Sequence, residues 1–161
     1  PVNLEVFLAE VIKGYKRQLE EKKCFVNLKR EDSPTLNVDP KALRMVFNNL
    51  ISNAIRYSPV GSTLTIHLHK TGKYWGVDFE DQGFGFEKKD MKKIFRKFYR
   101  VQNTDTQNIE GAGLGLFISS EIVNNHKGRL KVSRQGRGKG SLFSVLLPVS
   151  REVEVVRQLD E

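Results

Sequence analysis

The chain has a single cysteine, Cys24, among its 161 residues, so it can form neither an internal disulfide nor a four-cysteine metal site. It also lacks any apolar run close to the roughly 20 residues that span a bilayer, and no signal peptide opens it. These absences favour a reducing compartment and argue against a transmembrane segment. The first residue is Pro1 instead of methionine, so we expect a fragment or a processed product.

What is present has the composition of one globular domain, with 39% apolar and 29% charged residues. Lys and Arg outnumber Asp and Glu by 27 to 19, and the net charge of +8 favours anionic partners: nucleic acid, membrane or phosphate. The excess is concentrated. Residues 87–100 carry seven basic and two acidic side chains, and residues 127–139 carry six basic and no acidic ones. Each cluster fits a solvated face as well as a binding surface.

Hydrophobic spacing predicts helices and strands that are interleaved along the chain. Apolar residues at intervals of three and four predict a helix over 4–23, and another that begins with Asp39 as N-cap and Pro40 as its first residue and ends at Tyr57. Further helices are expected just after residue 86 and from Gly115 to about 125, and strands at 25–29, 64–68, 75–79, 130–133 and 142–147. Because two connections are hairpins, we expect a mixed sheet in an α/β domain.

Four polar side chains share one stripe of the second long helix. Asn49 and Asn53 are four residues apart, and Arg56 and Tyr57 lie one turn further on. Amide oxygens on such a stripe can bind a hard cation such as Mg²⁺, and a guanidinium suits phosphate. A plain polar helix face would show the same pattern.

Two glycine-containing segments can approach a ligand closely. In 81–86, DQGFGF, the carboxylate of Asp81 at the base of the loop can accept a hydrogen bond from an exocyclic amine. In 111–116, GAGLGL, successive N–H groups open a helix and form an anion site, although the segment is neither a Rossmann fingerprint nor a P-loop. Between them, aromatic residues of 94–100 could anchor a mobile segment, and polar residues 102–110 predict a mobile loop.

The order and spacing of these elements resemble a known family. Asn49-x-x-x-Asn53, Asp81-x-Gly83-x-Gly85, Phe95-x-x-Phe98 and Gly111-x-Gly113-x-Gly115 resemble the N, G1, F and G2 boxes of bacterial sensor histidine kinases. The resemblance is to their catalytic ATP-binding domain, in the superfamily shared with type II topoisomerases and mismatch-repair ATPases. It implies a Bergerat α/β (α+β) two-layer sandwich, with a mixed sheet covered on one face by helices. By this resemblance, residues 1–161 form one domain, in which residues 1–3 are the remnant of a linker and residues from about 151 to 161 form a C-terminal tail.

The resemblance also implies roles for individual residues in binding ATP and Mg²⁺. Asp81 would bind the adenine amine, Tyr57 would pack near the base, and Asn53, helped by Asn49, would hold Mg²⁺. Arg56 and Arg100 would contact phosphates, while the glycines frame the lid and the phosphate loop. The full set of implied ATP-binding residues is Asn49, Asn53, Arg56, Tyr57, Asp81, Gly83, Gly85, Phe98, Arg100, Gly111, Gly113, Leu114, Gly115, Leu116 and Ser141. Gln82, Phe86 and Ala112 stand where the family usually has Asn, Ile and Thr.

One residue separates the reaction classes of the superfamily. Its ATPases carry a Glu that activates water where this chain has Asn49, and an amide cannot act as a general base. A histidine imidazole is already a nucleophile, so we expect a histidine kinase domain that positions ATP for an acceptor. None of His67, His69 and His126 lies in the family's acceptor motif. We therefore expect the acceptor on a missing dimerisation and phosphoacceptor domain, and no autophosphorylation by this fragment.

The implied partners are that phosphoacceptor domain and the receiver domain of a response regulator. We expect a cytoplasmic, monomeric fragment of a homodimeric protein; the sequence leaves open whether the parent is anchored to the inner membrane. The basic cluster at 87–100 leads into the lid and can attract a triphosphate, so no nucleic-acid partner is expected. The alternatives are an ATPase module that drives a conformational change and a degenerate pseudokinase that serves as an interaction platform.

Overall fold

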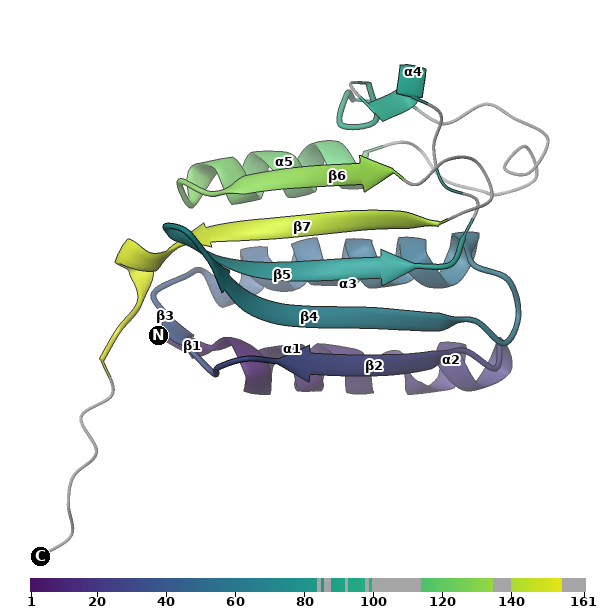
Figure 1. The fold of residues 1–161 in the computed structure, drawn as a ribbon, viewed down its shortest axis with the longest axis horizontal. Coiled ribbons are helices and arrows are strands. Elements are labelled where there is room, and N and C mark those ends of the chain that lie inside the picture. Colours follow the sequence, from purple (N-terminus) through teal and green to yellow (C-terminus); the bar gives the residue numbers. More distant parts are fainter. Residues whose placement is uncertain are drawn as a thin grey trace, which may run out of the picture.

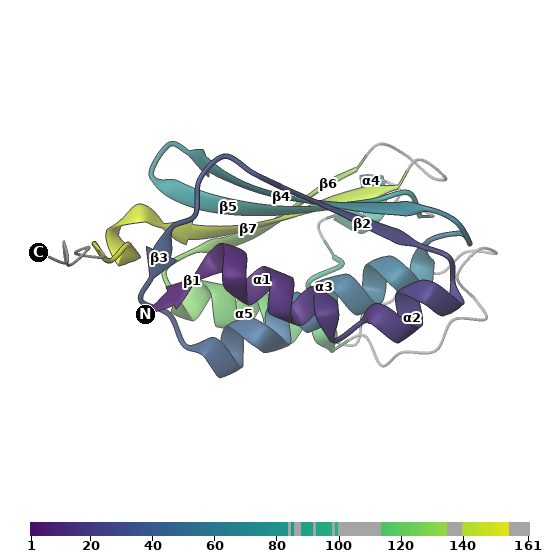
Figure 2. The ribbon, with the colours of Figure 1, turned by 90° about the horizontal axis from the view of Figure 1, so that it is seen from below.

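A computed structural model describes residues 1–83, 85, 88–91, 93–97, 99, 114–134 and 140–154. A five-stranded sheet is covered on one face by helices, as Figures 1 and 2 show. The strands, in their order across the sheet, are β2 (Phe25–Arg30), β4 (Thr63–Thr71), β5 (Tyr74–Asp81), β7 (Ser141–Pro148) and β6 (Arg129–Arg134). The helices on the covered face are α1 (Leu4–Lys13), α2 (Lys16–Glu21), α3 (Pro40–Tyr57) and α5 (Gly115–Asn125). This confirms the predicted two-layer sandwich.

The sheet is mixed, as the two hairpins predicted. Strands β2 and β4 are parallel, whereas the β4–β5, β5–β7 and β6–β7 pairs are antiparallel. Along β4, Leu64, Ile66 and Leu68 are buried toward the helices, and the residues between them face the other side. The central strand β5 ends at Asp81 with its last side chain directed into the covered side.

Helix α3 crosses the middle of the covered face, and local signals fix where it starts. The Asp39 carboxylate accepts hydrogen bonds from the N–H groups of Lys41 (3.0 Å) and Ala42 (3.2 Å), and Pro40 is the first helical residue, as predicted. The Phe47 ring lies 5.8 Å from that of Phe7 and 5.6 Å from that of Phe79. These rings join α1, α3 and β5 in one core.

The prediction of one helix over 4–23 is wrong, because the chain breaks into α1 and α2 at Gly14 and Tyr15. Gly14 is the C-cap of α1, and glycine is among the weakest helix formers. The hydroxyl of Tyr15 donates to the carbonyl of Asn48 on α3 (3.1 Å), which fixes the break against the helix layer. The apolar spacing runs through this break because Tyr15 and Leu19 still pack on the core.

Residues near both ends of the described chain pack on the domain, within the segments 1–3 and 151–161 that the resemblance assigns to a linker remnant and a tail. Val2–Asn3 (β1) pairs with Thr35–Leu36 (β3). After the 3₁₀ turn Val149–Arg151 (η1), the indole N–H of Trp75 donates to Glu152 (2.9 Å). Residues 155–161 lie outside the described residues. No helix in the described part of the chain is long and apolar enough to cross a membrane.

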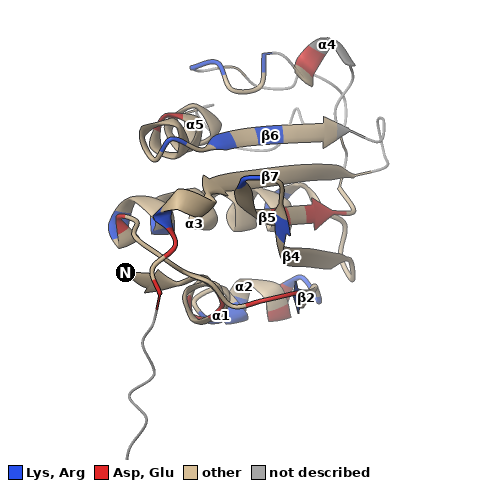
Figure 3. Ribbon diagram, turned by 60° about the vertical axis from the view of Figure 1, so that its left-hand side comes forward, with Lys and Arg blue, Asp and Glu red and all other residues tan. Residues whose placement is uncertain are grey.

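The described part of the basic cluster at 127–139 lies on an edge of the sheet. Strand β6 is an outer strand, and Arg129 and Lys131 are exposed along it, within the blue segments of β6 in Figure 3. Lys127 is exposed in the turn just before β6. Charged side chains on an edge strand oppose pairing with another chain. This position fits the solvated face that the sequence left open for the cluster.

Candidate functional site

The carboxylate of Asp81 is held on both oxygens at the end of the central strand. Its Oδ1 accepts hydrogen bonds from the N–H groups of Gly83 (2.9 Å) and Ser141 (3.2 Å), and its Oδ2 accepts one from the Ser141 hydroxyl (2.6 Å). Asp81 is 9% exposed and Ser141 4% exposed. The carboxylate is therefore fixed in one orientation, and Ser141, expected to bind ATP, donates two hydrogen bonds to it.

Burial sets the electrostatics of this carboxylate. Removal from water raises the pKa of Asp81, and the hydrogen bonds from Ser141 and Gly83 partly offset that rise. An ionised carboxylate kept in such a place lowers the stability of the fold at neutral pH. A side chain retained at that cost is a candidate for a binding role.

Two glycines, Gly83 and Gly140, allow the loop after Asp81 to pack closely against the end of α3 and against the start of β7. A Cβ atom on Gly83 would lie 2.7 Å from the carbonyl oxygen of Tyr57, so the loop lies against the end of α3. Gly140 has φ +82°, and its N–H donates to the carbonyl of Gly83 (3.0 Å). The side chain of Gln82 accepts a hydrogen bond from the N–H of Thr63 (2.9 Å), which ties the loop to the start of β4. Gln82, a departure from the family pattern, thus has a structural contact of its own.

The amide of Asn49 joins α3 to the start of α5. Its Nδ2 donates to the Ser119 hydroxyl (3.3 Å), and a Cβ atom on Gly115 would lie 2.0 Å from its Oδ1. Only a residue without a side chain lets α5 begin this close to Asn49. With Nδ2 engaged, Oδ1 is the atom that can face a ligand at the N-terminal end of α5.

We expect Gly115→Ala to displace the Asn49 amide and to break its bond to Ser119. The expected cost is about 1–2 kcal/mol in the free energy of unfolding, since the clash is with a side chain that can rotate away. In an Asn49→Ala background the same change should cost much less, because the atoms that clash are gone. Urea denaturation of the four proteins of this double-mutant cycle measures the difference. Equal costs in both backgrounds would refute the proposed contact.

The segment after α4 (Lys88–Met91) is anchored to the domain by aromatic side chains. The short helix predicted here was expected to carry Ile94 and Phe95 as well, but it ends at Met91, and residues 93–97 form turns and a bend. The Phe95 ring meets that of Phe143 edge-on at 6.4 Å, and the Tyr99 hydroxyl donates to the buried carboxylate of Asp90. That hydrogen bond, with burial, raises the pKa of Tyr99 to about 12. Phe95 and Tyr99 thus make the kind of contact that was expected of anchoring aromatic residues.

The structure brings some predicted site residues together and places others only by element. Tyr57, Gly83, Asp81 and Ser141 meet at one point, and Asn49 meets Gly115 at another. Asn53 is half-buried one turn after Asn49, and Arg56 is exposed near the end of α3. Among the remaining predicted residues, Gly85 has φ +69°, the Leu114 carbonyl accepts from the N–H of Ile118, and Leu116 packs on the core. Phe98, Arg100, Gly111, Gly113 and the loop 102–110 lie outside the described residues.

Ser119 and Gly140 belong to this region but were not among the predicted site residues. Ser119 follows Gly115 by four residues in the expected helix, so a search for polar residues on that face would have found it. Gly140 directly precedes Ser141, but its need for a positive φ shows only in the folded chain. Both act by holding Asn49 or Asp81 in place.

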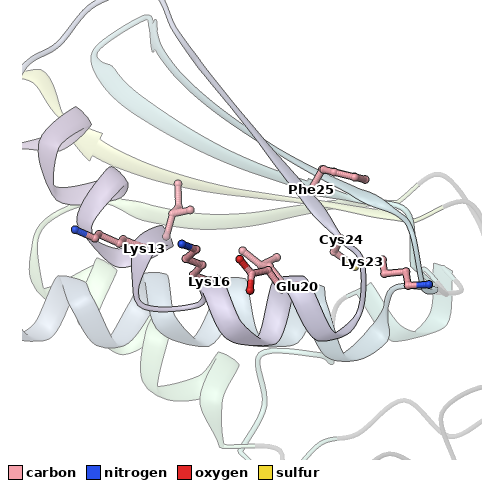
Figure 4. Close-up of a pocket in the computed structure, with 8 residues that line it drawn as sticks. Lys13, Lys16, Glu20, Lys23, Cys24 and Phe25 are labelled. Carbon is pink, nitrogen blue, oxygen red and sulfur yellow. The ribbon is translucent and has the colours of Figure 1, made fainter.

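A separate groove of about 570 Å³ lies between α1, α2 and the start of β2 (Figure 4). Three lysines, Lys13, Lys16 and Lys23, surround it, together with Glu20. Its lining residues come from none of α3, β5 and α5, so the groove is distinct from the predicted nucleotide site. The rest of the lining is Ile12, Leu19, Cys24 and Phe25.

The structure is thus an α/β sandwich with a fixed, buried carboxylate at the end of a central strand, beside a helix that carries amide side chains. A family model described as histidine kinase-, DNA gyrase B- and HSP90-like ATPase matches residues 38–151, and the chain belongs to this family. It is therefore an ATP-binding domain, and its relatives place it with the catalytic domains of sensor histidine kinases.

Among curated relatives, the adaptive-response sensory kinase SasA of Synechococcus elongatus is 40% identical over 121 residues, which are 74% of this chain and 30% of that protein. The sensor histidine kinase WalK of Bacillus subtilis is 31% identical over 150 residues, 92% of this chain and 24% of that protein. The chain thus spans less than a third of the length of these two relatives.

Solved structures agree with the fold. The Acinetobacter baumannii histidine kinase AdeS matches with a TM-score of 0.72 and 27% identity, over 91% of this chain and 64% of that chain. Full-length ShkA, solved in complex with AMPPNP, matches with a TM-score of 0.79 and 25% identity, over 92% of this chain and 30% of that chain.

Proposed function

We propose that this chain binds Mg²⁺-ATP and presents its γ-phosphoryl group to a histidine on a separate phosphoacceptor domain. The observation that carries the proposal is the Asp81 carboxylate, buried and held by Gly83 and Ser141 at the end of β5. Its Oδ2 accepts only the Ser141 hydroxyl among the described residues, so a lone pair is left for the exocyclic amine of adenine. A carboxylate, which only accepts hydrogen bonds, selects an amine over a carbonyl at that position.

The phosphate end of the nucleotide would lie where α3 meets α5. Asn49 and Asn53 offer amide oxygens one turn apart, and oxygen ligands suit Mg²⁺. The ion, when bound, neutralises phosphate charge. The Ser119 hydroxyl orients the Asn49 amide so that its Oδ1 is directed away from that bond, beside Gly115. Arg56 and Arg100 would add positive charge near the phosphates.

The chain's own residues favour transfer over hydrolysis. Asn49 cannot take a proton from water, so the domain supplies position and charge while the acceptor imidazole attacks phosphorus in line. The new N–P bond forms as the bond from phosphorus to the ADP oxygen breaks.

None of the three histidines is placed to be that acceptor. Both ring nitrogens of His126 are engaged, with the carbonyl of Ile122 (2.8 Å) and the N–H of Asp39 (3.1 Å). His67 and His69 lie on the face of the sheet opposite the helices. The acceptor in this proposal is therefore a histidine of the dimerisation and phosphoacceptor domain, which would pass the phosphoryl group to a response regulator.

A radiolabel experiment tests the transfer. The chain is mixed with [γ-³²P]ATP, Mg²⁺ and the phosphoacceptor domain of its parent protein, and acid-labile, base-stable label is expected on that domain. Steady-state release of phosphate by the chain alone, without such labelling, would favour the ATPase alternative. Absence of nucleotide binding at millimolar Mg²⁺-ATP would rule out both and leave the interaction platform.

Asn53→Ala tests the metal site. We expect affinity for ATP in the presence of Mg²⁺ to fall about tenfold or more, while affinity for adenosine stays unchanged because the base contact is intact. Calorimetric titrations with and without EDTA separate the two contributions. Met45→Ala, an exposed position on the same helix, is the control and should leave both affinities unchanged. An equal loss for adenosine and Mg²⁺-ATP would contradict the assignment.

A further inference from the structure

Two histidines and a carboxylate form a cluster on the uncovered face of the sheet. His67 and His69 are two residues apart on β4, so both side chains face the same side, and Asp78 of β5 is the cross-strand partner of His67. The Nε2 of His69 lies 2.8 Å from Asp78 Oδ2, and the two imidazole rings stack at 4.8 Å. One nitrogen from each histidine and one oxygen of Asp78 all lie within 4.8 Å of one another.

The sheet holds this cluster half-buried and in place. His69 and Asp78 are 18% and 21% exposed, and a Cβ atom on Gly76 would lie 3.0 Å from the His69 ring. Gly76 is the cross-strand partner of His69, so its lack of a side chain gives the ring room to lie over β5. The contact of the His69 ring with the backbone at Gly76, together with its hydrogen bond to Asp78, limits the rotamers of His69.

A fourth ligand of the right chemistry lies at the outer side of the cluster. Glu31, directly after β2, has its Oε1 3.5 Å from His67 Nε2. Glu31 and Asp78 together outweigh the positive charge of Lys29, which pairs with His67 in register. Negative charge is thus left to balance a divalent cation.

We propose that His67, His69 and Asp78 bind a divalent transition-metal ion such as Zn²⁺, with Glu31 or water as the fourth ligand. Zinc takes neutral imidazole nitrogens and carboxylate oxygens at about 2.0–2.2 Å, so four ligands surround it with neighbouring ligand atoms under roughly 4 Å apart. The three ligand atoms now lie within 4.8 Å of one another, so ring rotation on metal binding would have to shorten only the longest of these spacings. Imidazole ligands favour zinc, copper or nickel over Mg²⁺, so this site differs in chemistry and in position from the one proposed at Asn49 and Asn53.

Isothermal titration of the chain with ZnCl₂, without nucleotide or Mg²⁺, tests the site. We expect one ion per chain, a rise in the thermal unfolding midpoint with zinc, and visible absorption bands of tetrahedral Co²⁺ when cobalt replaces it. His67→Gln and His69→Gln should each weaken zinc binding at least tenfold and remove the cobalt bands. Circular dichroism checks that each variant is folded.

A matched pair of charge changes separates ligation from general electrostatics. Asp78→Asn and Glu80→Gln each remove one negative charge from β5 on the same face, but only Asp78 belongs to the cluster. We expect the first to weaken zinc binding at least tenfold and the second to change it less than twofold. Cys24→Ser should also have no effect. Absence of binding at micromolar zinc, equal effects of the matched pair, or loss on Cys24→Ser would each overturn the proposal.

Discussion

Asp81→Asn is expected to weaken the binding of ATP, ADP and adenosine about 100-fold or more while leaving the fold intact. If the Asn oxygen takes the place of Oδ1, it accepts from Gly83 and Ser141, and its NH₂ group then faces the adenine amine. If the amide is turned, the NH₂ group faces two backbone N–H donors instead. Either orientation sets donor against donor, and a site built to accept a hydrogen bond then rejects its ligand.

The same variant should be as stable as the parent at neutral pH, or more stable. Burial raises the folded-state pKa of Asp81. The protonated side chain therefore contributes to stability below the ordinary carboxyl pKa, and this contribution is lost as the pH rises through the raised value. At pH 7 the buried, ionised carboxylate lowers the free energy of unfolding, whereas the neutral amide carries no such desolvation cost. We expect any advantage in the thermal unfolding midpoint to shrink as the pH falls through the pKa of Asp81.

Calorimetry and thermal unfolding over a pH series check these two expectations together. Ser141→Ala is the control, because it removes one hydrogen bond to Oδ2 but keeps the carboxylate as acceptor. It should weaken nucleotide binding far less than Asp81→Asn. Unchanged affinity for adenosine in Asp81→Asn would show that the carboxylate does not recognise the base.

Features with local causes were predictable from the sequence. Asp39 and Pro40 specify the start of α3 through contacts within four residues, and alternation in β4 and β5 shows which side chains face the helices. The stripe of Asn49 and Asn53 followed in the same way from the helical repeat. The four motifs then indicated the family, because their order leaves few other folds.

Features that depend on contacts between distant segments could not be predicted. The break at Gly14 is fixed by Tyr15 reaching Asn48, 33 residues away, and the apolar spacing carries no trace of it. The pairing of Val2–Asn3 with Thr35–Leu36 needs both segments in place. Likewise, the sequence does not show that the Ser141 hydroxyl donates a hydrogen bond to Asp81, 60 residues earlier in the chain. At the site, the candidate side chains could be predicted from the sequence, whereas the residues that orient them could be identified only from the tertiary structure.

Gly140→Ala should be among the most destabilising single changes in the described chain, with an expected loss of about 3–5 kcal/mol. A Cβ atom there would lie 2.1 Å from the carbonyl oxygen of Asp81, a backbone atom that cannot rotate away. The positive φ of +82° adds strain of about 1–2 kcal/mol for any residue with a side chain. Relief of the clash would shift Asp81 relative to Ser141, so nucleotide binding should fall as well.

Gly61→Ala isolates the steric part of this loss. Gly61 has nearly the same φ, +81°, but no heavy atom beyond its own residue and its two chain neighbours lies within 4 Å of the position of its Cβ, so only the backbone strain applies. Urea denaturation should show a loss of about 1–2 kcal/mol for Gly61→Ala, with nucleotide affinity unchanged. A Gly140→Ala protein too unstable to purify agrees with this expectation only if Gly61→Ala purifies normally. Similar losses in the two variants would mean that strain alone explains Gly140, and that the close approach of β7 to the end of β5 does not hold Asp81 in place.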